Sequence, residues 1–293
     1  MSLAHWIEAA RVVVGMNRRN VLGILPRNQR RDFPVADDKL LAKRILREAG
    51  VPVAPTLATF SHFGEIRELG ARIGHLPEFV VKPAQGSGGR GILVIAEQAG
   101  ERLRTAGNRW LTRDQLRKHV ADIVYGVYSL DRGDVAVVEP RLRPSPFFAS
   151  LFPQGLTDVR VIVVDHEPVL AMLRVPTLAS DGRANLHQGA LGLAVDVSTG
   201  AITRAWWRRR VVEAHPDSGA PLLDLRVPGW ATICDVAVRA GRAVPLRYLG
   251  VDVVVDDAWG PLVLEINARP GLEIQNVNGI GLRARLDALG IAI

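Results

Sequence analysis

The sequence predicts an α+β fold in which hairpins of short strands occur together with amphipathic helices. Two segments, 79–95 and 251–266, each contain a pair of apolar, β-branched runs separated by glycine-rich or turn-forming residues, as β-hairpins do. A third segment, 39–49, has apolar residues at helical spacing. Because a short hairpin joins antiparallel strands, the sheets are expected to be antiparallel.

The first part of the chain, residues 1–36, is expected to form an N-terminal arm, with a short amphipathic helix over 3–14 and then a basic, proline-containing link. The helix over 39–49 has acidic residues at its start and Gly50 after its end, which are typical start and stop signals. The remaining predicted elements are helices over 61–73, 112–120 and 230–243, and strands over 135–138, 159–164, 169–175 and 193–197.

The first hairpin carries Lys82 at the end of an apolar strand, followed by the glycine-rich stretch 84–91 and a second strand over 92–95. A dinucleotide-binding loop or a P-loop requires a helix straight after the glycines, and this short β-branched run does not provide one. The remaining interpretation is a flexible hairpin whose backbone N–H groups close over phosphates beside the Lys82 charge. The alternative is an ordinary glycine hairpin whose lysine reaches solvent.

The second hairpin places three oxygen-bearing side chains on one face. If it folds symmetrically about residues 258 and 259, Asp252 lies opposite Glu265, and Asn267 shares that face because side chains alternate along a strand. With nothing basic between them, two carboxylates and an amide oxygen favour a hard cation such as Mg²⁺. The alternative is the polar outer face of an ordinary hairpin. The opposite, core-facing side would consist of Val251, Val253, Leu264 and Ile266.

Composition and charge exclude several classes of protein. The 293 residues are 48% hydrophobic and 5% aromatic, so we expect an ordinary globular protein, in the cytoplasm by default. No apolar run approaches the ~18 residues of a membrane span. The single cysteine, Cys234, excludes an intrachain disulfide framework. The net charge of +7 comes from small, scattered arginine groups without interleaved aromatic residues, which argues against nucleic-acid binding. An anionic small molecule as ligand, or simply an arginine-rich genome, explains the charge as well.

The order of Lys82, the glycine hairpin and the late Asp252, Glu265 and Asn267 set resembles the ATP-grasp superfamily. Segments 38–55, 158–164 and 184–190 resemble its α-L-glutamate ligase branch, which includes the enzyme that adds glutamate to a ribosomal protein. The likeness runs from about residue 37 to residue 281. It implies two α/β lobes whose antiparallel sheets clamp ATP. The implied divisions after the arm are a helical lead-in over 37–77, a lid lobe over 78–139, and a metal- and phosphate-binding lobe over 140–293.

The resemblance also implies nucleotide-binding and metal-binding residues. Lys82 would contact the α- or β-phosphate, and Lys39 would also bind the nucleotide. Asp252, Glu265 and Asn267 would hold one or two Mg²⁺ ions, with Mn²⁺ as a substitute. The flexible lid would consist of Gln85, Gly86, Ser87, Gly88, Gly89, Arg90 and Gly91. The adenine contacts would come from Glu139, Pro140 and Arg141, although Pro140 lacks an N–H and so removes one usual donor.

Five further residues would act on the reacting groups. Arg160 and Arg174 would stabilise charge on the transferred phosphoryl group, because a planar guanidinium can bind phosphate in a bidentate manner. Asn185 and His187 would line the acceptor side, with His187 as a general base towards the amine, and the alternative for both is an exposed turn. Arg269 stands where glutamate ligases commonly have a small residue. A related branch, associated by context with sugar-transfer pathways, has such an arginine and a shortened N-terminus.

The implied activity is ATP- and Mg²⁺-dependent ligation of a carboxylate, such as glutamate or another amino acid, to an amine of a small molecule or peptide through an acyl phosphate. Only 36 residues precede the first matching helix, so a full N-terminal domain is expected to be lacking. The acceptor surface would then come from the arm, the 179–190 loop, a partner protein or a second subunit. The alternatives are a nucleotide-binding regulatory or scaffold protein without turnover, and a nucleic-acid-binding protein.

Overall fold

The computed structural model describes residues 11–86 and 88–293, and the chain divides into two compact units. The larger unit comprises the described residues up to Asp37 together with 41–53 and 143–293. The smaller unit comprises 38–40 and 54–142. The helix predicted over 3–14 falls largely outside the described residues, and so does Ser87. Within the described residues, no helix is both long enough and apolar enough to cross a membrane.

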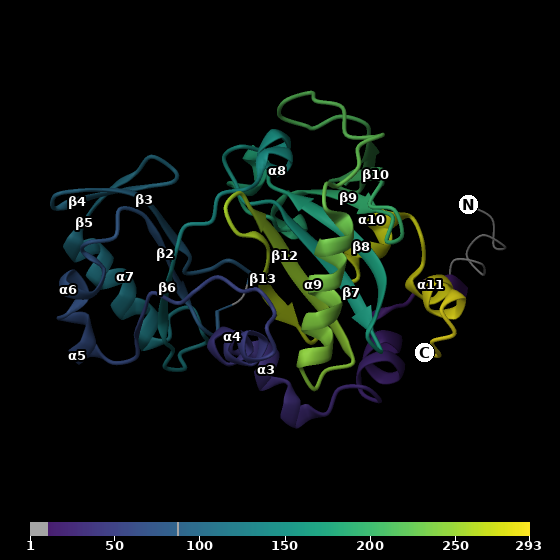
Figure 1. Cartoon of the computed structure of the whole chain (residues 1–293), viewed down its shortest axis with the longest axis horizontal. Coiled ribbons are helices and arrows are strands. Elements are labelled where there is room, and N and C mark those ends of the chain that lie inside the picture. The colour runs from purple at the N-terminus through teal and green to yellow at the C-terminus, as the bar shows by residue number, and fades with distance from the viewer. Residues whose placement is uncertain (1–10, 87) are drawn as a thin grey trace. The chain divides into compact units, whose positions relative to one another are not determined.

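The smaller unit is built on a six-stranded antiparallel sheet with the order β1-β6-β2-β3-β4-β5 (Figure 1). Its strands are β1 (Ala58–Phe60), β2 (Phe79–Pro83), β3 (Leu93–Ala99), β4 (Arg102–Thr105), β5 (Trp110–Thr112) and β6 (Ala136–Glu139). Its helices are α5 (Phe63–Ile66), α6 (Leu69–Ile73) and α7 (Arg113–Tyr125). The single helix predicted over 61–73 is therefore wrong. Gly64 and Gly70 weaken a continuous helix, and Glu68 leaves helical geometry with φ −86° and ψ 0°.

Helix α7 begins with a capping box. The Thr112 hydroxyl accepts from the Gln115 N–H, and the Gln115 side chain accepts from the Thr112 N–H, so two otherwise unpaired donors are satisfied. The helix ends at Gly126, which has the left-handed conformation that glycine adopts without strain. The predicted end at Val120 was too early, because Ile123 and Val124 continue the buried face of the helix.

The larger unit is built on a seven-stranded antiparallel sheet with the order β11-β10-β9-β8-β7-β12-β13. Its strands are β7 (Asp158–Val164), β8 (Glu167–Val175), β9 (Leu191–Val195), β10 (Ile202–Trp207), β11 (Arg210–Val212), β12 (Tyr248–Asp256) and β13 (Gly260–Asn267). Its helices are α8 (Pro146–Leu151), α9 (Trp230–Ala243), α10 (Glu273–Asn278) and α11 (Leu282–Ala288), with 3-10 turns η3 (Leu178–Ser180) and η4 (Leu186–Gln188). Helix α4 (Lys39–Glu48) confirms the predicted first helix and begins in the smaller unit.

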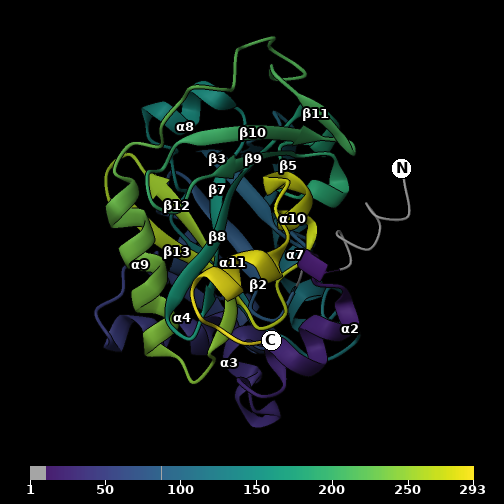
Figure 2. The ribbon, with the colours of Figure 1, turned by 90° about the vertical axis from the view of Figure 1, so that its right-hand side faces the viewer.

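The two faces of the seven-stranded sheet are covered by different helices. Helix α9 packs along β12, β13 and β7, and its buried residues Ile233, Ala237 and Ala240 recur at helical spacing. Helices α10 and α11 pack against β8, and α10 also against β9 and β10. Figure 2 shows α9 on one side of the strands and these two helices on the other. The helix predicted over 230–243 is confirmed residue for residue.

The hairpin formed by β12 and β13 confirms the predicted pairing of Asp252 with Glu265. Near the turn, however, the pairs Val253–Val263 and Val254–Leu262 centre on Ala258, and the register then shifts at Leu264. Leu264 is the additional residue of a β-bulge, and it turns Glu265 to the face of Asp252. The predicted core position of Leu264 is wrong for this reason. Val263 takes that position, 3% exposed, and Leu264 is only partly buried.

The N-terminal segment packs on the larger unit as short helical turns: α2 (Met16–Arg18), a π-helix (Arg19–Ile24), a 3-10 turn (Arg30–Asp32) and α3 (Pro34–Asp37). Its buried Asn28 accepts from the Arg247 and Tyr248 N–H groups and donates to the Tyr248 carbonyl. Its buried Arg19 donates to the carbonyl of Pro270 at 2.8 Å. These contacts join the segment to the first residues of β12 and to the residues just after β13.

Candidate functional site

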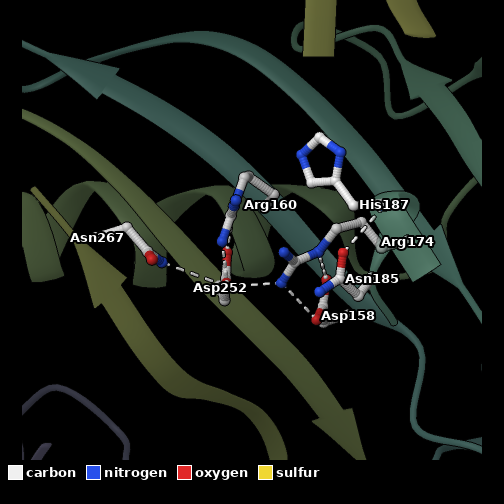
Figure 3. A network of polar contacts seen from close by, with 7 residues as sticks. All are labelled: Asp158, Arg160, Arg174, Asn185, His187, Asp252 and Asn267. Atoms are coloured by element: carbon white, nitrogen blue, oxygen red, sulfur yellow. Dashed lines mark hydrogen bonds and ion pairs between the residues drawn. The ribbon is translucent and has the colours of Figure 1, made fainter. Parts of the chain in front are cut away.

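Four charged residues form a row across three adjacent strands of the larger unit (Figure 3). In the antiparallel register Asp158 of β7 lies opposite Arg174 of β8, and Arg160 of β7 lies opposite Asp252 of β12. Alternation along β7 then places all four side chains on one face of the sheet, while the intervening valines face the core. The order of strands β8, β7 and β12 therefore assembles the site from segments up to 94 residues apart in sequence (Asp158 to Asp252).

The row is a chain of alternating charges joined by short contacts. Arg160 binds Asp252 through Nε and Nη2, both at 2.6 Å from a carboxylate oxygen. Arg174 binds Asp158 in the same bidentate manner at 2.6 Å, and its Nη2 also lies 2.6 Å from Asp252 Oδ2. Both carboxylates are almost fully buried, at 4% side-chain exposure. Bidentate pairing of this kind fixes the plane of each guanidinium as well as its position.

The two carboxylates respond differently to this environment. Burial raises the pKa of Asp158 to about 6, because Arg174 only partly offsets the lost hydration. Burial also acts to raise the pKa of Asp252, but Arg160 and Arg174 together outweigh it and hold that pKa below its ordinary value. Burial acts to lower the pKa of Arg174, yet the two carboxylates raise it overall. Asp252 is therefore the more firmly ionised of the two.

Glu265 and Asn267 complete the row at the edge formed by β13. Figure 3 draws the Asn267 amide nitrogen towards Asp252 Oδ2, at 3.4 Å. The reversed amide makes better contacts, since its nitrogen then donates to Glu265 Oε1 and its oxygen accepts from Arg160 Nη2, both at 3.0 Å. The expected oxygen set of Asp252, Glu265 and Asn267 thus converges on one face.

These residues fit Mg²⁺ by the chemistry of their donor atoms. Mg²⁺ takes one or two carboxylates together with phosphate oxygens, which two carboxylates and an amide oxygen can accommodate. Among the described residues no group of three or more His, Cys, Asp and Glu side chains could hold a metal by itself. The expectation that nothing basic lies between the carboxylates is wrong, because β7 and β8 supply Arg160 and Arg174. A cation at Asp252 would share its carboxylate with these arginines.

Asn185 and His187 lie at the 3-10 turn η4, after β8. The Asn185 side chain accepts from the His187 N–H at 3.0 Å and so caps the turn. The His187 side chain is exposed, and Figure 3 shows it pointing away from the ion pairs. The turn thus has the local geometry of a capped loop, and the acceptor role of the two residues stays a prediction.

Arg269 follows β13 and is held against the N-terminal segment. Its guanidinium carbon lies 4.5 Å from the centre of the Phe33 ring, which is a cation–π distance. Its neighbour Pro270 is bound by Arg19. Arg269 is exposed, so its remaining N–H groups are accessible to solvent or to an anion.

Lys82 of the smaller unit is buried and paired with Glu139. Its Nζ lies 2.7 Å from Glu139 Oε2, and both side chains are about 5–6% exposed. Strands β2 and β6 are neighbours, so the two predicted nucleotide-binding residues come together. The alternative in which Lys82 reaches solvent is excluded by this burial. A buried lysine is costly without an anionic partner because it loses its hydration, and Glu139 provides that partner.

The start of the glycine hairpin is fixed by side chains from elsewhere in the smaller unit. Lys39 Nζ donates to the Gly86 carbonyl at 2.5 Å, and the Gln85 N–H donates to the Asp134 carboxylate at 3.1 Å. Gly88 and Arg90 are exposed beyond this point. Of the other predicted residues near the adenine, Arg141 pairs with Glu78 at 3.2 Å and Pro140 directly follows β6.

Asp158 was not among the residues predicted for the site, although the sequence carried a signal for it. The turn residues Asp165 and His166 join two β-branched runs, and a hairpin centred near them pairs Asp158 with Arg174. A carboxylate opposite an arginine within such apolar strands indicates a buried ion pair. No similar signal joined Arg160 to Asp252, because β7 and β12 are distant in sequence.

Two antiparallel sheets with flanking helices, one with a glycine hairpin and one with an acidic hairpin, define the ATP-grasp fold. The chain belongs to the sugar-transfer associated ATP-grasp family, whose model matches residues 18–290. The predicted superfamily and the predicted α+β fold are confirmed.

The chain is similar to a probable alpha-L-glutamate ligase 1 of Hahella chejuensis, with 26% identity over 86% of this chain and 62% of the relative. It is 27% identical to the ribosomal protein bS6–L-glutamate ligase of Salmonella paratyphi B, over 91% of this chain and 67% of the relative. The chain thus spans about two thirds of the length of these relatives. A biotin carboxylase structure from Campylobacter jejuni matches with a TM-score of 0.54 and 17% identity, over 87% of this chain and 46% of that protein, which supports the fold.

Proposed function

We propose that this protein is an ATP- and Mg²⁺-dependent ligase that joins a carboxylate to an amine. The observation that carries the proposal is the single sheet face on which Asp252, Glu265 and Asn267 meet two partly buried, oriented arginines. Such a face has the charges that phosphoryl transfer requires, namely oxygen ligands for a cation and guanidinium groups for phosphate oxygens. The relatives named as glutamate ligases support the same class of reaction.

In the proposed reaction a substrate carboxylate oxygen attacks the γ-phosphorus of ATP, and ADP leaves. The amine nitrogen then attacks the carbonyl carbon of the acyl phosphate, a C–N bond forms, and phosphate leaves as the amine loses a proton. Asp252, Glu265 and Asn267 would hold Mg²⁺, which neutralises phosphate charge when bound. The protein's contribution is mainly positioning and charge neutralisation, and no covalent intermediate on a side chain is needed.

The remaining predicted residues have proposed roles in binding. Lys82, Lys39 and the residues 85–91 would bind the nucleotide phosphates, and Glu139 to Arg141 would contact the adenine. Arg160 and Arg174 would stabilise the transferred phosphoryl group. Asn185 and His187 would line the acceptor side. The exposed Arg269 would bind a carboxylate or phosphate of the substrate, because its stacking on Phe33 leaves the edge of its guanidinium available.

The test is release of ADP from Mg-ATP in the presence of pools of amino acids, peptides and a metabolite extract, with products identified by mass spectrometry. Release is expected with at least one pool and is expected to fall at least 100-fold in Glu265→Gln, because the variant loses one charged metal ligand. Glu167→Gln removes an equal charge from an exposed position of the same unit and should retain full activity. ATP binding without release in any pool, unchanged by Glu265→Gln, would contradict the ligase and favour a regulatory role.

A further inference from the structure

The far end of the glycine hairpin is held by two side chains that the proposed chemistry does not use. The Gly91 carbonyl lies 3.0 Å from Nε2 of His119, on α7. The Tyr128 hydroxyl lies 3.5 Å from Nδ1 of the same imidazole, and the two ring centres are 5.7 Å apart. Gly91, His119 and Tyr128 therefore form one contact group, in which His119 lies between the hairpin and the residues that follow α7.

The contact depends on glycine at position 91. Its φ is +76°, in the left-handed region that side chains rarely adopt. A Cβ atom at this position would lie 2.7 Å from two carbons of the Tyr128 ring. The ring thus packs directly on the backbone of Gly91, while His119 binds its carbonyl. These two contacts fix both the conformation and the position of the residue at which the hairpin returns to β3.

The hydrogen bonds also define the state of His119. Burial lowers its pKa, so the ring is neutral at pH 7. Because Nε2 faces a carbonyl oxygen, Nε2 carries the proton and donates it to Gly91. Nδ1 is then the acceptor that the Tyr128 hydroxyl faces. Tyr128 in this way supports the tautomer that His119 needs in order to bind the hairpin.

The opposite end of the hairpin is also held, by Lys39 at Gly86 and by Asp134 at Gln85. The glycine hairpin thus has both ends held by side chains from elsewhere in the smaller unit, and at least Gly88 and Arg90 between them are exposed. Holding both ends favours anion binding by the backbone N–H groups of the hairpin, since each free end adds conformations that must be lost on binding.

We propose that His119 is a positioning residue for the nucleotide, acting through the Gly91 carbonyl to fix the far end of the glycine hairpin, with Tyr128 as its support. The inference rests on the proposed function of the hairpin in phosphate binding. His119 itself would make no contact with the nucleotide, because it acts through the hairpin backbone. Its substitution is expected to weaken nucleotide binding while leaving the maximal rate of turnover near that of the wild type.

The first test is limited trypsin digestion, which can report on the hairpin through a single site. Arg90 is the only lysine or arginine between Lys82 and Arg102, and the Lys82–Pro83 bond resists trypsin. Cleavage after Arg90 is followed by mass spectrometry. His119→Ala should raise its rate roughly five- to tenfold, as loss of one partly buried hydrogen bond implies. His119→Gln places an amide N–H near the position of Nε2 and should stay within about twofold of the wild type. An unchanged rate in His119→Ala, or an equal rise at all tryptic sites, would contradict the claim that His119 holds the far end of the hairpin.

The second test measures Mg-ATP binding by calorimetry and, where turnover is found, KM for ATP and kcat. His119→Ala should raise Kd and KM roughly five- to tenfold with kcat within about twofold, and His119→Gln should restore both constants. Equal affinity in the wild type and His119→Ala would overturn the positioning role. If the wild type does not bind Mg-ATP but His119→Ala still raises the rate of cleavage after Arg90, the proposed function fails and the role of His119 in holding the hairpin stands.

Discussion

Each charge in the row of the proposed site has an opposite charge as its neighbour. Asp158, Arg174, Asp252 and Arg160 alternate in sign along the row, and short contacts join each to the next. Burying a single one of these charges without its partner would be costly, because the lost hydration would not be replaced. The row is therefore expected to respond strongly to removal of one member, particularly Arg174, which contacts both carboxylates.

Arg174→Met should lower the free energy of unfolding by about 3 kcal/mol at pH 8, the effect typical of breaking a buried ion pair. The loss should be smaller at pH 5. Burial already raises the pKa of Asp158 to about 6, and removal of the guanidinium would raise it further, so Asp158 takes up a proton at pH 5 and is no longer an unpaired charge. Urea denaturation at the two pH values measures both effects.

Arg174→Lys serves as the matched control because it retains the charge without the planar fork. It should lose less stability than Arg174→Met at pH 8 and show a weaker dependence on pH. Equal losses at pH 5 and pH 8 for the methionine variant would contradict the assignment of an orphaned Asp158 carboxylate.

Individual elements were the part of the structure most accessible from the sequence. The helix over 230–243 and the pairing of Asp252 with Glu265 follow from local patterns, namely helical spacing and a turn between β-branched runs. The single helix predicted over 61–73 is wrong because the chain leaves helical geometry at Glu68, between two short helices that each contain a glycine. The ion pairs of Asp252 could not be predicted, since they depend on β7 lying between β8 and β12, and strand order is decided by packing of the whole sheet.

Helix α7 offers a test at the scale of one element. Thr112→Ala removes the hydroxyl that accepts from Gln115, and the free energy of unfolding should fall by about 1 kcal/mol, the usual value of an N-cap. Thr112→Ser keeps the hydroxyl and should remain within about 0.5 kcal/mol of the wild type. Thermal or urea unfolding compares the three proteins, and equal losses in both variants would refute the capping contribution.

At the scale of the molecule, the N-terminal segment is joined to the C-terminal half of the larger unit by buried polar contacts. Asn28 makes three hydrogen bonds to the backbone of residues about 220 positions later. The sequence did not reveal these contacts, because a single asparagine in a polar stretch has no periodic pattern that would mark it as buried. The segment predicted as an arm is consequently part of the folded unit.

Asn28→Ala would leave the Tyr248 N–H and carbonyl and the Arg247 N–H without their partner. The free energy of unfolding should fall by about 3 kcal/mol, since each buried unsatisfied group costs about 1–3 kcal/mol. Gln29→Ala, at the exposed neighbouring position, should change it by less than about 0.5 kcal/mol. A urea titration that gives the two variants equal midpoints would contradict the structural role of Asn28.

The buried phenol of Tyr248 should make the free energy of unfolding fall in strong alkali. Burial raises its pKa to about 12, above the value of about 10 in an unfolded chain. The folded protein therefore retains the phenolic proton that the unfolded chain releases, so the stabilisation is complete below pH 10 and is lost as the pH rises towards 12. Tyr248→Phe should lack this part of the decline, by about 2–3 kcal/mol between pH 10 and pH 12. If the free energy of unfolding falls equally with pH in the wild type and in Tyr248→Phe, this contribution of Tyr248 is excluded.

The bulge at Leu264 bears on how relatives of this chain can be aligned. Because Leu264 is surplus to the ladder, a hairpin without it could still pair the same aspartate and glutamate in a regular register centred on Ala258. A relative with one residue fewer between these two carboxylates would thus retain the same pair of cation ligands. An alignment gap at this position should be interpreted as a change in strand twist, and the spacing of 13 residues from Asp252 to Glu265 should not be required of a search pattern.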